Sequence, residues 1–326
     1  MPLTDLSQPR IHLGLTPWSM RSDTLAEQAR LAEDFGYDSI WLPENHFSGL
    51  AAVPDPLMLL ASMAGTTSKI ALGTTSYLLP LRHPLQAAEQ VAVLDQLSNG
   101  RLILGLGRGY QAPTYAAFGI AMRQKRAIFA QSLAVMRRAW AGEELQMLEG
   151  ATPVTLAPLP VQRPHPPLWV AAFGPKALAQ VGSLGLPYLA SPVESRQDLA
   201  NNLRTLREAC DAAGQPIPGA VPVMRTLFVS EDAAQLDAAR SELAKSMKQM
   251  AGAGPAHLAK AALADVDDVA IVGKPKEVRD QVAQYRDELG MTHLIATRLR
   301  FSGKGGINND ALQLSAQQLP EILAGL

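Results

Sequence analysis

Short apolar runs alternate with longer amphipathic segments along most of the chain. The runs are apolar on both faces, which is typical of strands in a parallel sheet covered by helices. We expect strands at Ile11–Thr16, Ser39–Pro43, Ile70–Thr75, Leu102–Leu106, Leu168–Ala172, Pro187–Ala190, Val221–Val229 and His293–Thr297. The segments between them repeat apolar residues with a helical period. They predict helices at Leu25–Phe35, Pro56–Gly65, Leu85–Leu97, Arg123–Trp140, Lys176–Ser183, Ser195–Ala213, Ala233–Met250 and Pro275–Leu289.

Strands that alternate with helices in this way predict an α/β fold, and we expect a (β/α)8 barrel. A doubly wound open sheet is the alternative, because the alternation does not show whether the sheet closes. The chain exceeds the usual barrel length of about 250 residues, so insertions are expected. One, Gly107–Met122, follows the fourth strand. The other, Leu145–Pro167, precedes the fifth strand and could hold a hairpin of Leu145–Leu148 with Val154–Leu156. No repeat or linker divides residues 1–326, which we expect to form a single domain.

Composition narrows the class of protein. Lys and Arg total 29 against 30 Asp and Glu, so no basic excess favours nucleic acid and no charged tail favours a membrane surface. The single Cys210 cannot form an internal disulfide. The first residues lack the basic start and apolar run of a secretory signal. The longest nearly apolar stretch, Pro56–Gly65, is about half the length that spans a bilayer. We therefore expect a soluble, cytoplasmic protein.

The segments that follow the strands carry the candidate chemistry, because barrel active sites form at the carboxyl ends of the strands. These segments combine aromatic residues, histidines and an arginine among glycines, which suits a planar apolar ligand with an anionic tail. In LGLGRGY (Leu104–Tyr110) the glycines allow a close backbone approach, and the Arg108 guanidinium offers two parallel donors that match phosphate. A structural turn with a surface arginine is the alternative.

Two further segments add to this site. Gly174 and Pro175 open a helix whose free N–H groups could bind an anion beside Lys176, although an ordinary helix start explains them equally well. In WLPENHF, His46 could act as an acid or base, or it could simply hold the loop. The six histidines show no metal-ligand spacing, so we expect no metal.

Four segments together resemble the bacterial luciferase-like flavin-dependent monooxygenases. They are AEDFGYDSIWLPENHF (Ala32–Phe47), LGTTSYLLPLRHPLQAAEQVAVLDQLSNGRLILGLGRGY (Leu72–Tyr110), PPLWVAAFGPKALAQVGSLGLP (Pro166–Pro187) and VGKPKEVRDQVAQYRDELGMTHLI (Val272–Ile295). The second segment is long and specific, and the others fall in the family's order. The resemblance covers most of the chain.

The resemblance implies a closed barrel and an FMN cofactor. Reduced FMN would come from a separate NAD(P)H-dependent flavin reductase, and with O2 it would oxygenate a small organic substrate through a C4a-peroxyflavin. The family also implies a homodimer formed through Pro56–Gly65 and Leu85–Leu97. Arg108 aligns with the arginine that holds the FMN phosphate, and a cis peptide bond is expected within Thr75–Tyr77. The implied cofactor-binding residues are Arg108, Gly109, Thr75, Ser76, Tyr77, Ala172, Gly174, Pro175 and Lys176.

One departure from the family concerns the catalytic base. Luciferase has two histidines after the second strand, whereas this chain has Asn45 followed by His46. An asparagine can hydrogen-bond to a flavin or peroxide oxygen but cannot accept a proton. We therefore do not expect luminescence, and we assign proton transfer to His46, Tyr110 or water. Trp18 and Phe47, with Tyr77 and Tyr110, are expected to line an apolar substrate pocket.

Two other functions stay open. Related barrels use the deazaflavin F420 for hydride transfer, and the same phosphate site would serve that cofactor. Asn45 at the position of the base also leaves open a flavin-binding protein without turnover.

Overall fold

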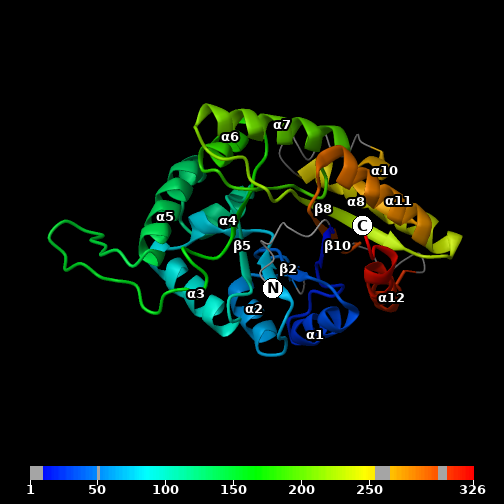
Figure 1. Ribbon diagram of the computed structural model, residues 1–326, viewed down its shortest axis with the longest axis horizontal. Helices are drawn as coiled ribbons and strands as arrows, with labels where there is room; N and C mark the ends of the chain where they lie inside the picture. Colours follow the sequence, from blue (N-terminus) through cyan, green and yellow to red (C-terminus); the bar gives the residue numbers. More distant parts are fainter. Residues whose placement is uncertain (1–9, 50–51, 254–264, 300–306) are drawn as a thin grey trace.

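The computed structural model describes residues 10–49, 52–253, 265–299 and 307–326. Within these residues, strands alternate with helices and pair in parallel within one sheet (Figure 1). The strands are β1 His12–Leu15, β2 Ser39–Leu42, β3 Ala71–Thr74, β4 Tyr77–Leu78, β5 Leu102–Gly107, β6 Leu168–Ala171, β7 Tyr188–Leu189, β8 Pro222–Val229, β9 Ala270–Gly273 and β10 His293–Thr297. The helices are α1 Leu25–Phe35, α2 Pro56–Ala64, α3 Pro84–Leu97, α4 Ala112–Ala117, α5 Lys125–Trp140, α6 Pro175–Ser183, α7 Arg196–Ala212, α8 Ala233–Ala253, α10 Val266–Val269, α11 Pro275–Leu289 and α12 Asn309–Ile322.

Local sequence signals place several helix ends. Gly36 ends α1 with φ +93°, and Gly290 ends α11 with φ +67°, a left-handed conformation that glycine adopts without a steric penalty. Pro275 opens α11 after Lys274, where the side chain of Glu277 accepts from the backbone N–H of Lys274. These ends agree with the expected helices.

The sheet curls so that its inner face encloses a small core of its own. Its hydrogen-bonded order is β7-β6-β5-β3-β2-β1-β10-β8-β9, with β4 attached to β5. Trp41 of β2 nevertheless stacks on Trp169 of β6, with ring centroids 4.9 Å apart, and Trp169 meets the His293 ring of β10 at 5.0 Å. Gly73 makes room for Trp41, because a Cβ there would lie 2.1 Å from the indole. The α/β class and the curled parallel sheet are therefore confirmed.

Closure into a complete eight-stranded barrel stays our prediction. In the described residues the hydrogen-bonded order ends at β7 and β9, without a ladder between β7 and β8. The buried Arg225 of β8 links these strands by donating to the carbonyl oxygens of Ser191 and Glu194, at 3.4 and 2.8 Å.

Some elements were not predicted. β4 has two residues and β9 has four. β9 pairs with the second half of β8, on the edge opposite β10. Helix α12 contains Pro320, which reads in the sequence as a helix stop. Helix α4 lies within the expected insertion Gly107–Met122.

The segment before β6 leaves the body of the molecule. An antiparallel bridge joins Leu145 to Val154, where the sequence suggested a hairpin. Figure 1 shows this green segment projecting outward beyond α3 and α5.

Among the described residues, no helix combines the length and apolar character that a bilayer crossing requires.

Candidate active site

Two glycines of β5 allow the segment after β3 to lie against that strand. A Cβ on Gly105 would lie 1.9 Å from the carbonyl oxygen of Thr74, and a Cβ on Gly107 would lie 1.9 Å from Oγ of Ser76. The Thr75–Ser76 peptide bond in this segment is cis, as the resemblance implied. The alternating glycines of LGLG therefore place the cis peptide at the carboxyl end of the sheet.

A buried carboxylate organises the loops on this side. Glu44 follows β2, and its Oε1 lies 2.7 Å from both His46 Nε2 and Arg82 Nη1. Its Oε2 accepts from the backbone N–H of Leu78 at 2.8 Å. Arg82 also lies over the ring of Tyr77, with its guanidinium carbon 4.0 Å from the ring centroid. Glu44 thereby ties the β2 loop to the segment after the cis peptide.

Aromatic side chains surround the ring of His46. Phe118, which follows α4, meets His46 edge-on at 5.0 Å, and Phe47 lies 5.8 Å from it. Phe47 is 73% exposed although it is large and apolar, and its φ is +58°, a conformation rare for a bulky residue. Tyr110 is also exposed, whereas Tyr77 is fully buried. We call Phe47 and Phe118, whose rings lie 6.3 Å apart, the aromatic rim.

Arg108 lies just beyond the end of β5 and is buried. Its Nη1 donates to Gln180 Oε1 at 2.6 Å, and its Nη2 donates to the carbonyl oxygen of Ala171 at 3.2 Å. Burial, together with the nearby charge of Arg126, lowers the pKa of Arg108 to about 10, so the guanidinium stays charged at neutral pH. Tyr115 donates to the carbonyl oxygen of Arg108 and fixes its backbone.

Two more cations gather beside Arg108 at the start of α5. Lys125 Nζ donates to the carbonyl oxygen of Gly109 at 2.9 Å. Burial and the charges of Arg108 and Arg126 lower the pKa of Lys125. In the described part of the chain, no carboxylate pairs with Arg108, Lys125 or Arg126, which we call the cationic cluster. A hollow of about 440 Å³ beside it is lined by Met122, Arg123, Lys125 and Arg126.

The start of α6 lies across from this cluster. Gly174 precedes the helix with φ +78°, and Pro175 occupies its first turn. Gly174, Pro175 and Lys176 are exposed, whereas Ala172 is buried. Gln180, one helical turn further on, accepts from Arg108 and joins the two elements.

These residues fit an FMN cofactor. The cationic cluster and the backbone N–H of Lys176 at the start of α6 match a phosphate, because both offer donors to an anion. The buried Oγ1 of Thr75, at the cis peptide, has no hydrogen-bond partner. A buried hydroxyl without a partner is costly, so it points to a polar ligand group at this position.

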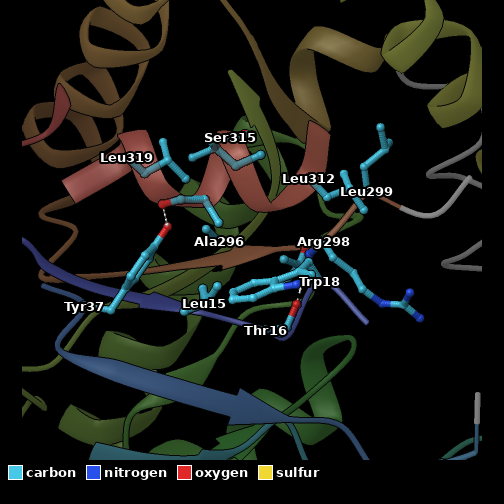
Figure 2. Close-up of a pocket in the computed structure, with 13 residues that line it drawn as sticks. Leu15, Thr16, Trp18, Tyr37, Ala296, Arg298, Leu299, Leu312, Ser315 and Leu319 are labelled. Atoms are coloured by element: carbon cyan, nitrogen blue, oxygen red, sulfur yellow. Dashed lines mark hydrogen bonds between the residues drawn. The ribbon is translucent and has the colours of Figure 1, made fainter. Parts of the chain in front are cut away.

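Trp18 lies elsewhere. It lines a cavity of about 30 Å³ together with Tyr37 and residues of β1, β10 and α12 (Figure 2). In this cavity Tyr37 donates to the carbonyl oxygen of Ala316, and the backbone N–H of Arg298 donates to Thr16 Oγ1. A cavity this small does not hold an organic substrate. The place of Trp18 in a substrate pocket stays a prediction.

Asn45 is engaged within its own loop. Its Oδ1 accepts from Ser48 Oγ and from the backbone N–H of Val53, and its backbone pairs with Val53 in both directions. This arrangement orders the loop that carries His46, and it leaves His46 as the better candidate for proton transfer.

Sequence reasoning did not assign roles to Glu44, Arg82, Lys125 or Arg126. A signal for the last two was present, because the first turn of a helix favours acidic residues, whereas α5 begins with Lys125 and Arg126 and has none. Cations at the positive, N-terminal end of a helix dipole are unfavourable unless an anion binds there, so they indicate an anion site. Across the described residues, no three His, Cys, Asp or Glu side chains gather as potential metal ligands.

The chain is similar to several known proteins. The family model described as luciferase-like monooxygenase matches residues 3–293. An uncharacterized protein of Sinorhizobium fredii is 30% identical over 220 residues, which cover 65% of this chain and 62% of that protein. The oxygenase component of the flavin-dependent trigonelline monooxygenase of Acinetobacter baylyi is 30% identical, over 48% of this chain and 44% of its own. The alkanal monooxygenase alpha chain of Photorhabdus luminescens is 26% identical, over 59% and 54%. The matches thus span less than two thirds of each of these relatives.

Solved structures cover more of the fold. The monooxygenase RslO1 of Streptomyces bottropensis is 25% identical, with a TM-score of 0.75 over 96% of this chain and 98% of its own. The oxygenating constituent of 3,6-diketocamphane monooxygenase of Pseudomonas putida, solved with FMN, is 20% identical, with a TM-score of 0.74 over 96% and 98%. The coenzyme F420-dependent tetrahydromethanopterin reductase of Methanopyrus kandleri is 21% identical, with a TM-score of 0.71 over 96% and 99%.

Proposed function

The chain belongs to the luciferase-like monooxygenase family, and we propose that it is an FMN-dependent monooxygenase that uses O2 to oxygenate a small organic substrate. The cationic cluster carries this proposal. Three neighbouring cations without carboxylate partners in the described residues need an anion, and a flavin phosphate at the carboxyl ends of the strands supplies one.

We assign the cofactor's phosphate to Arg108, Lys125 and Arg126, with backbone N–H groups of Gly109 and of the start of α6. The flavin ring would lie along Thr75–Ser76, within reach of the unpartnered hydroxyl of Thr75. Tyr77 contributes only its backbone, because its ring is buried beneath Arg82. When reduced and bound, FMN supplies the reaction with oxygen.

The chain's own residues orient the substrate and exchange a proton with it. The aromatic rim offers apolar surface that excludes water and orients a small organic molecule beside His46. His46 exchanges a proton with the substrate, because an imidazole nitrogen can accept or donate a proton and the ring is held by Glu44.

Two partners belong to this proposal. A relative named as an oxygenase component implies that a separate NAD(P)H-dependent reductase delivers reduced FMN. A second copy of the chain would pack on α2 and α3, where Met58, Val93 and Leu97 expose apolar side chains.

The test mixes the anaerobic protein, loaded with reduced FMN, with oxygenated buffer and follows the flavin absorbance. We expect a lasting phase whose spectrum matches neither reduced nor oxidised FMN, because an oxygenase must delay the return to oxidised flavin. Single-step reoxidation contradicts the proposed function. It favours F420-dependent hydride transfer if the chain binds F420 more tightly than FMN, and a flavin-binding protein without turnover if it does not.

A further inference from the structure

We propose that Glu44 is a positioning residue that holds the ring of His46 in the tautomer with hydrogen on Nε2. Nδ1 is then the nitrogen left to accept a proton. This inference rests on the proposed function only in the role that it gives to His46. The hydrogen bond itself is a property of the chain without ligand.

The contacts of Glu44 determine which group donates. Arg82 Nη1 and the backbone N–H of Leu78 can only donate, so both oxygens of Glu44 act as acceptors. His46 Nε2 lies 2.7 Å from the same Oε1 that accepts from Arg82. Nε2 must therefore supply the hydrogen of this bond, because a bare Nε2 and the carboxylate oxygen would repel each other at this distance.

The carboxylate is fixed from several directions. Its side chain is 0% exposed, and that of His46 is 7% exposed. Arg82 is held in turn by the ring of Tyr77 and by the carbonyl oxygen of Leu78, at 3.1 Å. Glu44 therefore has little freedom to release His46.

Glu44 is also the only polar partner of the His46 ring within the described residues. The other ring contacts are apolar, from Phe47 and Phe118. The titratable and charged groups around Glu44 are Arg82, the Tyr77 hydroxyl, which donates to Gln90, and Asp55 at the start of α2. Within this part of the chain, no second carboxylate competes for His46.

A tautomer fixed in this way has a chemical consequence. The bond that one ring nitrogen makes decides which nitrogen can accept a proton. In Glu44→Gln the amide has one acceptor oxygen and a donating NH2 group. That single oxygen cannot serve Arg82, Leu78 and His46 as the two carboxylate oxygens do. The bond that keeps hydrogen on Nε2 is therefore weakened, and the tautomer with hydrogen on Nδ1 gains population.

The test is a long-range ¹⁵N–¹H spectrum of the ¹⁵N-histidine-labelled full chain without ligand. It is recorded near pH 8.5, well above the pKa of about 6.5 of free imidazole. The variant His46→Gln identifies the His46 signals by their loss. We expect a hydrogen-bearing Nε2 and a bare Nδ1 in the wild type, and a larger share of the tautomer with hydrogen on Nδ1 in Glu44→Gln. A wild-type ring with hydrogen on Nδ1, or unchanged His46 signals in Glu44→Gln, would overturn the inference.

A matched control is Glu33→Gln. Glu33 also accepts from several backbone N–H groups, those of Ser68, Lys69 and Ile70, but it lies on α1 and has no contact with His46. We expect this variant to leave the His46 signals in place. Equal shifts in both variants would show a general loss of structure and overturn the specific role of Glu44.

If Glu44→Gln does not fold, Glu44→Asp tests the same bond by withdrawing the carboxylate by one methylene. We expect a mixture of tautomers there, whereas a fully retained hydrogen on Nε2 would overturn the inference. FMN titration separates this result from the proposed function. A wild type that binds no FMN would contradict the proposed function and leave the tautomer result standing.

Discussion

Glu194, between β7 and α7, carries the clearest pH dependence among the single residues. Its carboxylate accepts from the Tyr188 hydroxyl, from Ser191 N at 2.6 Å and from Asn202 Nδ2 at 2.7 Å. Burial raises the pKa of Glu194 to about 7, and these hydrogen bonds only partly oppose it. The native state therefore keeps a proton that the unfolded chain releases at lower pH.

The raised pKa of Glu194 fixes the direction in which stability changes with pH. The stability that Glu194 contributes is complete below the ordinary pKa of 4.5 and is lost as the pH rises to about 7. We expect the wild type to lose roughly 2–3 kcal/mol more free energy of unfolding than Glu194→Gln between pH 4.5 and 7. Urea unfolding at the two pH values measures this difference. Equal losses in both proteins would contradict the assignment.

The sequence indicates which residues belong to the site better than it indicates what holds them in place. LGLGRGY and WLPENHF point to Arg108 and His46 because each places a chemically capable side chain after a strand. The partners that hold them, Gln180 and Glu44, come from spacing in three dimensions. No local pattern shows that one carboxylate oxygen serves both His46 and Arg82, which lie 36 residues apart.

At the scale of elements, strand β5 shapes the site through its glycines. In Gly105→Ala the new Cβ would lie 1.9 Å from the carbonyl oxygen of Thr74, which has no freedom to move away. We expect this variant to lose roughly 2–3 kcal/mol of free energy of unfolding, measured by chemical denaturation. It should also weaken FMN binding, because the cis segment shifts.

Gly65→Ala is the matched control for Gly105→Ala. Gly65 ends α2 with φ −73°, and its nearest neighbour to a new Cβ is the carbonyl oxygen of Ser62 at 3.7 Å. We expect its stability to stay within about 1 kcal/mol of the wild type. A Gly105→Ala protein as stable as this control would show that close approach is not required.

Elements with a clear local apolar pattern could be predicted from the sequence, whereas β4 and β9 could not. The expected helix Leu25–Phe35 matches α1 because its apolar stripe and its terminal Gly36 are both local signals. Strand β9 forms by pairing with the edge of β8 that does not face β10, which is a tertiary cause. The same holds for β4, which exists only because it pairs with the end of β5.

At the scale of the whole molecule, the neighbouring helices α2 and α3 expose an apolar surface. Met58 is 71% exposed and Leu97 is 58% exposed. We expect the wild type to elute as a dimer in size-exclusion chromatography with light scattering, and Met58→Glu/Leu97→Glu to elute as a monomer, because charges cannot be buried unpaired. Leu314→Glu, on α12 and 55% exposed, is the control and should leave the dimer intact. A wild-type monomer, or a double variant that still dimerises, would contradict this surface as the interface.

Curling of the sheet is likewise a property of the whole molecule. The alternation of strands and helices allowed either a barrel or an open sheet. The stacking of Trp41 on Trp169 across two intervening strands requires the curled form. The alternation favoured a barrel and the family resemblance implied one, but the contact itself could not be predicted, because the two tryptophans lie 128 residues apart.

The central claim is that the cationic cluster holds the phosphate of a flavin, and equilibrium binding of FMN and riboflavin tests it most directly. These ligands differ only in the phosphate. A hydrogen bond to a charged group contributes about 1.5–3 kcal/mol, so wild-type protein should bind FMN at least about tenfold more tightly than riboflavin. Arg108→Ala should lose about 1.5–3 kcal/mol of FMN binding and leave riboflavin unchanged. Arg204→Ala, an exposed arginine of α7, is the control. Equal wild-type affinity for the two flavins, or unchanged FMN affinity in Arg108→Ala, would contradict the claim.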